Sequence, residues 1–284
     1  MTLESLYETA TAHVQSCPEN RISAADAISP HLAGMQIFES PIFAVGAADD
    51  PQFWRLREPG VVGPNSMLPA DWLREVRSVL SFFLPFSAAV RDSNRALAEK
   101  TSDEWLHARI EGQLMVNSLG AFLCSWLKER GHAAIYPAAD TRFQLTSPFA
   151  SNWSERHVAY ICGLGTFGLS KGLITSKGMA GRFGSIVTSA SLPITKQPYT
   201  NPFTYCTMCG KCQMNCPAQA IDVKRGIING KNHALCAAFI DRNTLPPHGP
   251  SRRIRFGCGK CQVGVPCETG IPRKKDDPNE SSPR

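Results

Sequence analysis

Residues 206–217 read CTMCGKCQMNCP, and no other stretch restricts the fold of this chain as strongly. Four cysteines separated by two, two and three residues and followed by proline form the run typical of bacterial ferredoxins. The two-residue spacers let one loop present three thiolates to one [4Fe–4S] cluster, while the fourth cysteine points toward a second cluster. Zinc is the weaker alternative, because this spacing does not match paired zinc knuckles.

Two clusters need eight thiolates, and beyond the four of this run the same region supplies Cys236, Cys258, Cys261 and Cys267. Residues 258–267 read CGKCQVGVPC, a second run whose last spacer is stretched. The exchanged pattern of two-cluster ferredoxins groups Cys206, Cys209 and Cys212 with Cys267. It groups Cys216 with Cys236, Cys258 and Cys261. In the alternative interpretation, Cys236 is a buried core thiol and the second cluster has three cysteine ligands.

The compartment follows from the start of the chain. MTLESLYETATAHVQS has early acidic residues and no apolar segment, so we expect no signal peptide. No stretch of about 18 apolar residues occurs, so we expect no membrane span and a cytoplasmic location. A reducing compartment favours metal binding over disulfides, and leaves Cys17, Cys124 and Cys162 as buried free thiols.

The remaining pattern predicts an α+β chain with two domains. Helices are expected at 2–14 and from a Thr101–Glu104 capping box through residue 127, where Gly131 closes the second helix. SVLSFFLPF (78–86) is expected to be a buried strand, with further strands at 133–138 and 183–192 and an irregular segment at 139–154. Composition changes near Thr195, which divides the chain into 1–195, 196–270 and a disordered tail at 271–284.

GLGTFG (163–168) matches the G-x-G-x-x-G fingerprint of dinucleotide-binding loops. That loop should follow a strand and precede an acidic residue about 20 positions on. The preceding SERHVAYIC has helical spacing instead, and no acid occurs between Glu155 and Asp222, so the context argues against a dinucleotide. The acid-free window is rich in glycine and lysine, which suits a large anionic ligand, negatively charged clusters, or glycine turns packed on the cysteine domain.

A resemblance follows from the order of these motifs. SER, GLGTFGL, LIT and GRFGSIVT, followed by CTMCGKCQMNCPAQAI and GCGKCQ, resemble the cobalamin-dependent epoxyqueuosine reductases and, more distantly, the reductive dehalogenases. The similarity covers roughly residues 75–270. It implies a nitroreductase-like α/β domain that binds a base-off corrinoid, followed by a bacterial ferredoxin-like 2×[4Fe–4S] domain that reduces cobalt to Co(I).

The resemblance also implies a set of residues that line or shape the corrinoid pocket. They are Asn152, Trp153, Arg156, His157, Gly163, Leu164, Gly165, Thr166, Phe167, Gly168, Lys171, Gly184 and Ser185. His157 is a candidate lower cobalt ligand or acid/base, with a structural hydrogen bond as the alternative. Trp153 either stacks on a ring system or belongs to the core.

The proton donor is the main departure from the family pattern. The reductases have an aspartate a few residues before the Glu-Arg pair, whereas this chain reads PFASNWSER. Asp140, followed by Thr141, resembles the family's Asp-Thr pair but lies further upstream. A dehalogenase-like tyrosine donor would be Tyr160 or Tyr136. Asp140 and Tyr160 are therefore the candidates, and the family lysine after the third glycine is replaced by Leu169, with Lys171 two places on.

The expected function is a cobalamin- and iron–sulfur-dependent reductase of an organic substrate, such as a small molecule or a modified nucleoside. Its electrons would come from an external donor of the ferredoxin or flavodoxin type. One alternative is an electron-transfer or activating protein without substrate turnover. Another is a tRNA-modifying epoxyqueuosine reductase proper, although the helical-repeat domain that grips tRNA in some family members is not found in the sequence.

Overall fold

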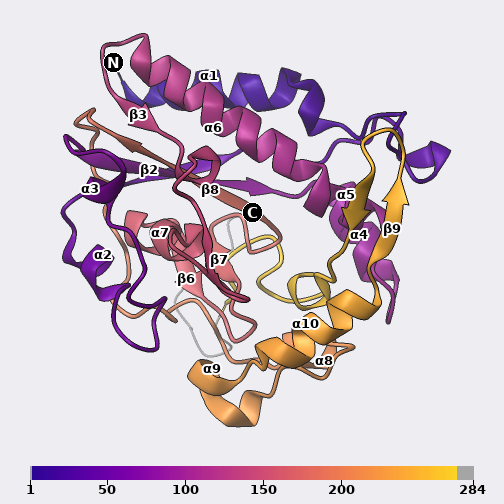
Figure 1. Cartoon of the computed structure of the whole chain (residues 1–284). Helices are drawn as coiled ribbons and strands as arrows, with labels where there is room; N and C mark the ends of the chain where they lie inside the picture. The colour runs from indigo at the N-terminus through magenta and orange to yellow at the C-terminus, as the bar shows by residue number, and fades with distance from the viewer. Residues whose placement is uncertain (1, 274–284) are drawn as a thin grey trace, which may run out of the picture.

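A four-stranded antiparallel sheet in the order β1-β2-β8-β3 forms the centre of the fold (Figure 1). Its strands are β1 (Ile42–Ala47), β2 (Ser78–Pro85), β8 (Gly181–Thr188) and β3 (Ala134–Ile135). Strand β2 pairs with β8 along its whole length, from Ser78↔Thr188 to Pro85↔Gly181. Every residue of β2 is buried, so the buried strand predicted from SVLSFFLPF is confirmed.

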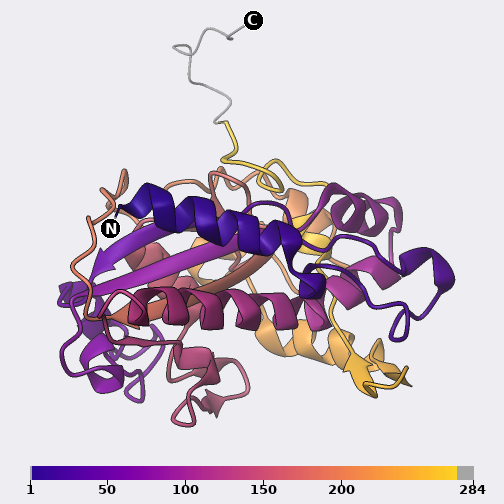
Figure 2. The same ribbon diagram turned by 90° about the horizontal axis from the view of Figure 1, so that it is seen from above.

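The computed structural model describes residues 2–273, so positions 274–284 of the predicted tail lie outside the described residues. Helices α1 (Leu3–Ser16) and α6 (Gly112–Lys128) lie side by side over one face of the sheet (Figures 1 and 2). Helix α7 (Glu155–Cys162) packs on the opposite face against β1, β2 and β8.

Two hydrophobic clusters therefore meet at the sheet, one on each face. Leu80 and Phe82 of β2 belong to the cluster under α1 and α6, whereas Val79 and Phe83 belong to the cluster under α7. Successive residues of β2 alternate between the two faces of the sheet, as in any strand. Both faces of the sheet are apolar because helices cover both of them.

The helix predicted to run from residue 101 to 127 is two helices, α5 (Asp103–Ile110) and α6. Its N-cap is Ser102 rather than Thr101, because the Ser102 hydroxyl accepts a hydrogen bond from the Trp105 amide at 3.2 Å. The helices meet at Glu111, where the amide of Leu114 bonds the Glu111 carbonyl in a tighter turn. Gly131 follows α6 in a left-handed conformation, as predicted.

The remaining elements are short and lie at the edges of this core. The helices are α2 (Pro51–Arg55), α3 (Pro69–Trp72), α4 (Ala88–Ala96), α8 (Lys211–Met214), α9 (Gly226–Asn229) and α10 (His233–Arg242). Three antiparallel hairpins are β4–β5 (Leu145–Ser147, Ala150–Ser151), β6–β7 (Gly165–Phe167, Leu173–Thr175) and β9–β10 (Leu245–His248, Arg253–Arg255). Single turns of 3₁₀ helix occur at Pro18–Asn20, Pro30–Leu32, Pro137–Ala139, Val223–Arg225 and Lys260–Gln262. The segment predicted as irregular at 139–154 thus contains β4–β5.

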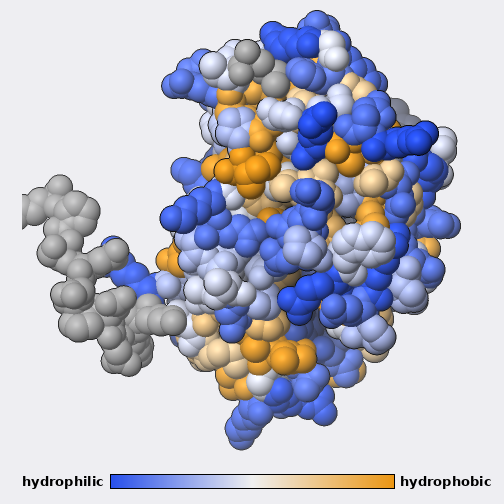
Figure 3. Space-filling view, turned by 90° about the vertical axis from the view of Figure 1, so that its left-hand side faces the viewer, coloured by the Kyte–Doolittle hydropathy of each residue, from blue (hydrophilic) through white to orange (hydrophobic). Residues whose placement is uncertain are grey.

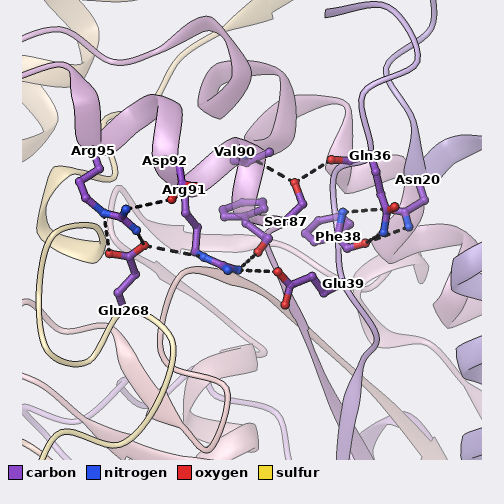
Figure 4. A network of polar contacts seen from close by, with 11 residues as sticks. Asn20, Gln36, Phe38, Glu39, Ser87, Val90, Arg91, Asp92, Arg95 and Glu268 are labelled. Carbon is purple, nitrogen blue, oxygen red and sulfur yellow. Dashed lines mark hydrogen bonds and ion pairs between the residues drawn. The ribbon is translucent and has the colours of Figure 1, made fainter.

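The cysteine-rich region packs against α4 and α5 through polar contacts. Glu268, one residue after Cys267, forms ion pairs with Arg91 and Arg95 of α4 (Figure 4). Arg91 also pairs with Glu39 at 3.0 Å, so one network joins the cysteine region, α4 and the segment before β1. Because Glu268 is almost fully buried, these contacts fix the chain beside Cys267.

The outer surface is mixed in polarity. On the face shown in Figure 3, hydrophobic residues gather in separate patches among hydrophilic ones. Within residues 2–273, no helix has both the length and the apolar character needed to cross a membrane.

Candidate metal centres and ligand cavity

The first cavity is lined by the four cysteines that the sequence assigns to one cluster. They are Cys206, Cys209, Cys212 and Cys267, and the cavity has a volume of about 20 Å³. Met208 and Gly210 have positive φ angles of 53° and 74°, which curl the 206–212 loop around the cavity. Cys209 is exposed, so this cavity lies close to the protein surface.

The glycine motif supports this loop. Thr166 accepts a hydrogen bond from the Tyr205 amide at 2.9 Å, and the Gly165 amide donates to the Tyr199 hydroxyl at 3.1 Å. Gly168 lines the first cavity. GLGTFG begins at the C-terminus of α7, where Gly163 has φ of 100°, and continues into β6. This helix-to-strand order is the reverse of a dinucleotide loop, so the structure excludes that reading and shows that the motif holds the chain leading into Cys206.

The second cavity is lined by the other four predicted ligands, Cys216, Cys236, Cys258 and Cys261. It is larger, with a volume of about 480 Å³, and extends from the cysteines to α5, α7 and β8. Cys236 faces it from α10, whose N-cap Asn232 accepts from the Leu235 amide at 3.0 Å. The reading of Cys236 as a core thiol is not supported, because its side chain lines this cavity.

The helix α4 positions the second cysteine run. The Asn94 side-chain amide donates to the Cys258 carbonyl at 3.0 Å, and the buried ammonium of Lys260 donates to the Asn94 and Leu97 carbonyls. Asn215 donates to the Val263 carbonyl at 2.8 Å, which joins the two cysteine runs to each other. The cysteine positions therefore depend on the fold of the first half of the chain.

The arrangement differs from a site for one ion. Among residues 2–273, no group of three or more histidine, cysteine or acidic side chains converges as a single-ion site. A cubane cluster separates its four thiolates more widely than one tetrahedral ion does.

Cations predominate in the lining of the second cavity. Basic residues there are Arg109, Arg156, Lys171, Arg182, Lys231 and Lys260, whereas Asp241 is the one acid in the described lining. Lys231 lies near Cys216, Cys236 and Cys261, whose charges raise the pKa of its ammonium against the opposing effect of burial. Aromatic walls come from Phe86, Trp105, Phe149 and Phe256. Phe149, at the tip of the β4–β5 hairpin, contacts the ring of His233 of α10.

A buried polar chain lies beneath α7. The Trp153 indole donates to the Ser185 hydroxyl at 2.9 Å, and Ser185 donates to the Glu155 carboxyl at 2.6 Å. The second carboxyl oxygen of Glu155 is buried with no hydrogen-bond partner in the described residues. Burial raises the pKa of Glu155 to about 8, so the neutral acid predominates near pH 7.

The residues expected around a corrinoid are distributed over several parts of the structure. Only Arg156 and Lys171 of that set line the second cavity. Trp153 stacks on Phe53 and meets Trp72 edge-on in the core, which agrees with the core alternative. Gly163 and Leu164 line a separate groove beside β1, and a Cβ at Gly184 would lie 2.3 Å from the ring of Phe82.

Other members of that set make local hydrogen bonds. Asn152 is buried and donates to the Arg142 carbonyl at 2.8 Å, and the Phe167 amide donates to the Pro202 carbonyl at 2.6 Å. His157 bonds the Ser154 hydroxyl at 2.8 Å through Nδ1, which agrees with the structural alternative. Burial, reinforced by Arg156, lowers the pKa of His157 to about 4.

Neither predicted proton donor reaches the two cysteine-lined cavities. Asp140 forms an ion pair with Arg142 at 2.8 Å, and hydrogen bonds from Arg142 lower the pKa of this carboxyl to about 2. Tyr160 stacks on Tyr199, and neither Asp140 nor Tyr160 lines either cavity. A carboxyl held ionised by a guanidinium is a poor proton donor near neutral pH.

Sequence reasoning did not single out several residues of the second cavity. Arg109 and Trp105 lie four positions apart on α5, and this helical spacing was the only available signal. Phe149 lies in the segment predicted as irregular. Nothing in the local sequence shows that α5, α10 and the β4–β5 hairpin meet at one cavity.

The fold has clear relatives among solved structures, although no protein-family model and no curated protein matches the chain. One is an epoxyqueuosine reductase bound to an epoxyqueuosine-modified tRNA stem loop, with 16% identity, a TM-score of 0.51, and coverage of 96% of this chain and 68% of that one. Another is epoxyqueuosine reductase from Streptococcus thermophilus, with 12% identity, a TM-score of 0.50, and coverage of 97% and 69%.

A third relative is the catabolic reductive dehalogenase NpRdhA, with 11% identity, a TM-score of 0.52, and coverage of 81% of this chain and 30% of that one. The resemblance noted in the motif order is therefore matched in three dimensions. The chain has the mixed α+β fold shared by epoxyqueuosine reductases and reductive dehalogenases.

Proposed function

We propose that this chain is an iron–sulfur reductase that holds two [4Fe–4S] clusters in its two cysteine-lined cavities and a corrinoid in the larger one. The observation that carries the proposal is the partition of the cysteines. Each set of four predicted from the exchanged ferredoxin pattern surrounds its own cavity. The fold of known reductases adds support.

The residues present fit the clusters better than they fit the corrinoid. Eight thiolates in two groups match two cubanes. The second cavity has room beyond its cysteines, and Arg156, Lys171 and the Gly181 backbone would contact a large ligand there. When bound, the clusters would supply one-electron transfer and the corrinoid a strongly reducing cobalt.

The chain's own residues would tune and shield these groups. Lys231 and Arg156 lie near cysteines of the second cavity. Their positive charges would offset the negative charge of a reduced cluster there. Phe149 contacts His233 and covers part of the cavity wall, which limits the access of water. An external donor of the ferredoxin or flavodoxin type would approach the first cavity, because Cys209 is exposed there.

One observation favours a second candidate, an electron-transfer or activating protein without its own substrate. Most residues expected around a corrinoid are used for packing or local hydrogen bonds. Such a protein would carry both clusters and pass electrons to a partner.

Anaerobic reconstitution with iron, sulfide and hydroxocobalamin separates the two candidates. A reductase should hold about eight irons and one cobalt per chain, with a base-off visible spectrum. About eight irons without cobalt would replace the first candidate by the second.

Single cysteine variants test the cluster assignment itself. Cys209→Ser and Cys258→Ser should each lower the iron content to about four per chain, or unfold the cysteine region, because metal binding and folding are coupled. Cys124→Ser is the matched control and should keep all iron, since Cys124 is buried on α6, away from both cavities. Unchanged iron in Cys209→Ser or Cys258→Ser would overturn the assignment.

A further inference from the structure

Two arginines line the second cavity, each from a different secondary-structure element. Arg109 comes from α5 and Arg182 from β8, and both side chains are half-buried. Arg109 lies over the ring of Phe256 at 4.2 Å, and Arg182 donates a hydrogen bond to the side-chain oxygen of Gln113. Within residues 2–273, no carboxylate forms an ion pair with either guanidinium.

The proximity of these cations has an electrostatic cost. Burial and then the repulsion of Arg109 lower the pKa of Arg182 to about 10, and burial lowers the pKa of Arg109. Two half-buried cations close to each other without a counter-ion are unfavourable unless a ligand supplies negative charge. An anion between them would relieve both desolvation and repulsion.

The clusters do not account for this charge. Lys231, Arg156 and Lys260 are the cations that interact with cysteines of the second cavity. No cysteine is among the charges that act on Arg109, and Arg182 responds to Arg109, Tyr136 and Arg156. The arginine pair is thus available to a different anion.

The rest of the lining describes the body of that ligand. Phe86, Trp105 and Phe149 line the same cavity as the arginine pair. Aromatic walls favour an apolar or planar group, and guanidinium groups match the two oxygens of a carboxylate or phosphate.

We propose that Arg109 and Arg182 bind the oxyanion of an organic substrate, a carboxylate or phosphate, whose apolar part packs against Trp105 and Phe149. The inference rests on the proposed function, because it names the substrate class of that reductase. The pair would hold the anionic end and present the rest of the substrate to the cavity.

Calorimetric titration of the anaerobic, cluster-loaded protein tests the site directly, with benzoate as the anionic probe and benzamide as its neutral isostere. Benzoate should bind at least about tenfold more tightly than benzamide, because charge-assisted hydrogen bonds are available only to the anion. Arg109→Gln and Arg182→Gln should each weaken benzoate binding about tenfold or more. Arg74→Gln removes an exposed arginine outside the cavity and should leave binding unchanged.

Three results would overturn the proposal. One is equal binding of benzoate and benzamide, and another is equal benzoate affinity in the three variants. The third is an Arg182→Gln variant that keeps its benzoate affinity and binds cobalamin more weakly than the wild type, but binds phosphate-free cobinamide equally well. In that case the oxyanion held by Arg182 would be the cofactor's phosphate. Arg182→Lys keeps the charge and should restore part of the affinity if the glutamine variant misfolds. The benzoate measurement needs no cobalt, so failure to bind cobalamin is a separate outcome.

Discussion

Replacing the buried acid Glu155 by glutamine should make the protein less sensitive to pH. In the native state burial raises the pKa of this carboxyl to about 8, against 4.5 for an ordinary glutamate. Between these values the folded protein holds a proton that the unfolded chain has lost. The contribution of Glu155 to stability is therefore greatest at low pH and falls as the pH rises toward 8.

The size of the change in stability follows from the pH range between the two pKa values of Glu155. One proton of difference changes the free energy of unfolding by about 1.4 kcal/mol per pH unit, so the rise from pH 5.5 to 7.5 costs up to about 2.7 kcal/mol. For a chain of this size that corresponds to a Tm lower by roughly 5 °C. Glu155→Gln keeps an acceptor for Ser185 and has no proton to lose, so this part of the pH dependence should disappear.

Anaerobic thermal unfolding at pH 5.5, 6.5 and 7.5 measures the difference between the wild-type and variant curves. Other titrating groups contribute equally to both proteins and cancel in that difference. Glu75→Gln, at an exposed position, is the matched control and should follow the wild type. Parallel wild-type and Glu155→Gln curves across this range would refute the argument that Glu155 is buried as a neutral acid.

Two further substitutions test how the cysteine region docks. Gly259 has φ of 68°, and a Cβ there would lie 2.0 Å from the Trp105 ring. Gly259→Ala should therefore destabilise the protein by about 2–4 kcal/mol and release iron. Gly131→Ala, with φ of 81° and open space, should cost only about 1–2 kcal/mol and keep its iron; equal losses would contradict the steric argument. Glu268→Gln should weaken the ion pair with Arg95 and increase the protease sensitivity of the cysteine region at low salt, whereas an unchanged cleavage rate would show that this pair does not hold the region in place.

The sequence predicted the parts of this fold that depend on local pattern. SVLSFFLPF is a mostly apolar run, and its strand is buried on both faces as expected. The spacing of the ferredoxin run also predicted which cysteines lie around a common cavity. In both cases the information lies within a few consecutive residues, or in a spacing rule that geometry imposes.

Features that depend on tertiary contacts were not predictable in the same way. The role of GLGTFG became clear only when Thr166 was found bonded to the Tyr205 amide, a partner 39 positions away. The second cavity needs α5, β8, α10 and the β4–β5 hairpin to meet, and no local pattern encodes that meeting. The resemblance in motif order did describe the fold, which solved relatives share.

The exchange of cysteines between the cavities has a consequence for how the protein assembles. Cys212 faces the first cavity and Cys216 the second, although one turn of chain separates them. The second run divides in the same way, since Cys261 and Cys267 face different cavities, and Asn215 bonds the Val263 carbonyl between them. Filling either site therefore positions a ligand of the other, so the two clusters should be acquired cooperatively during folding.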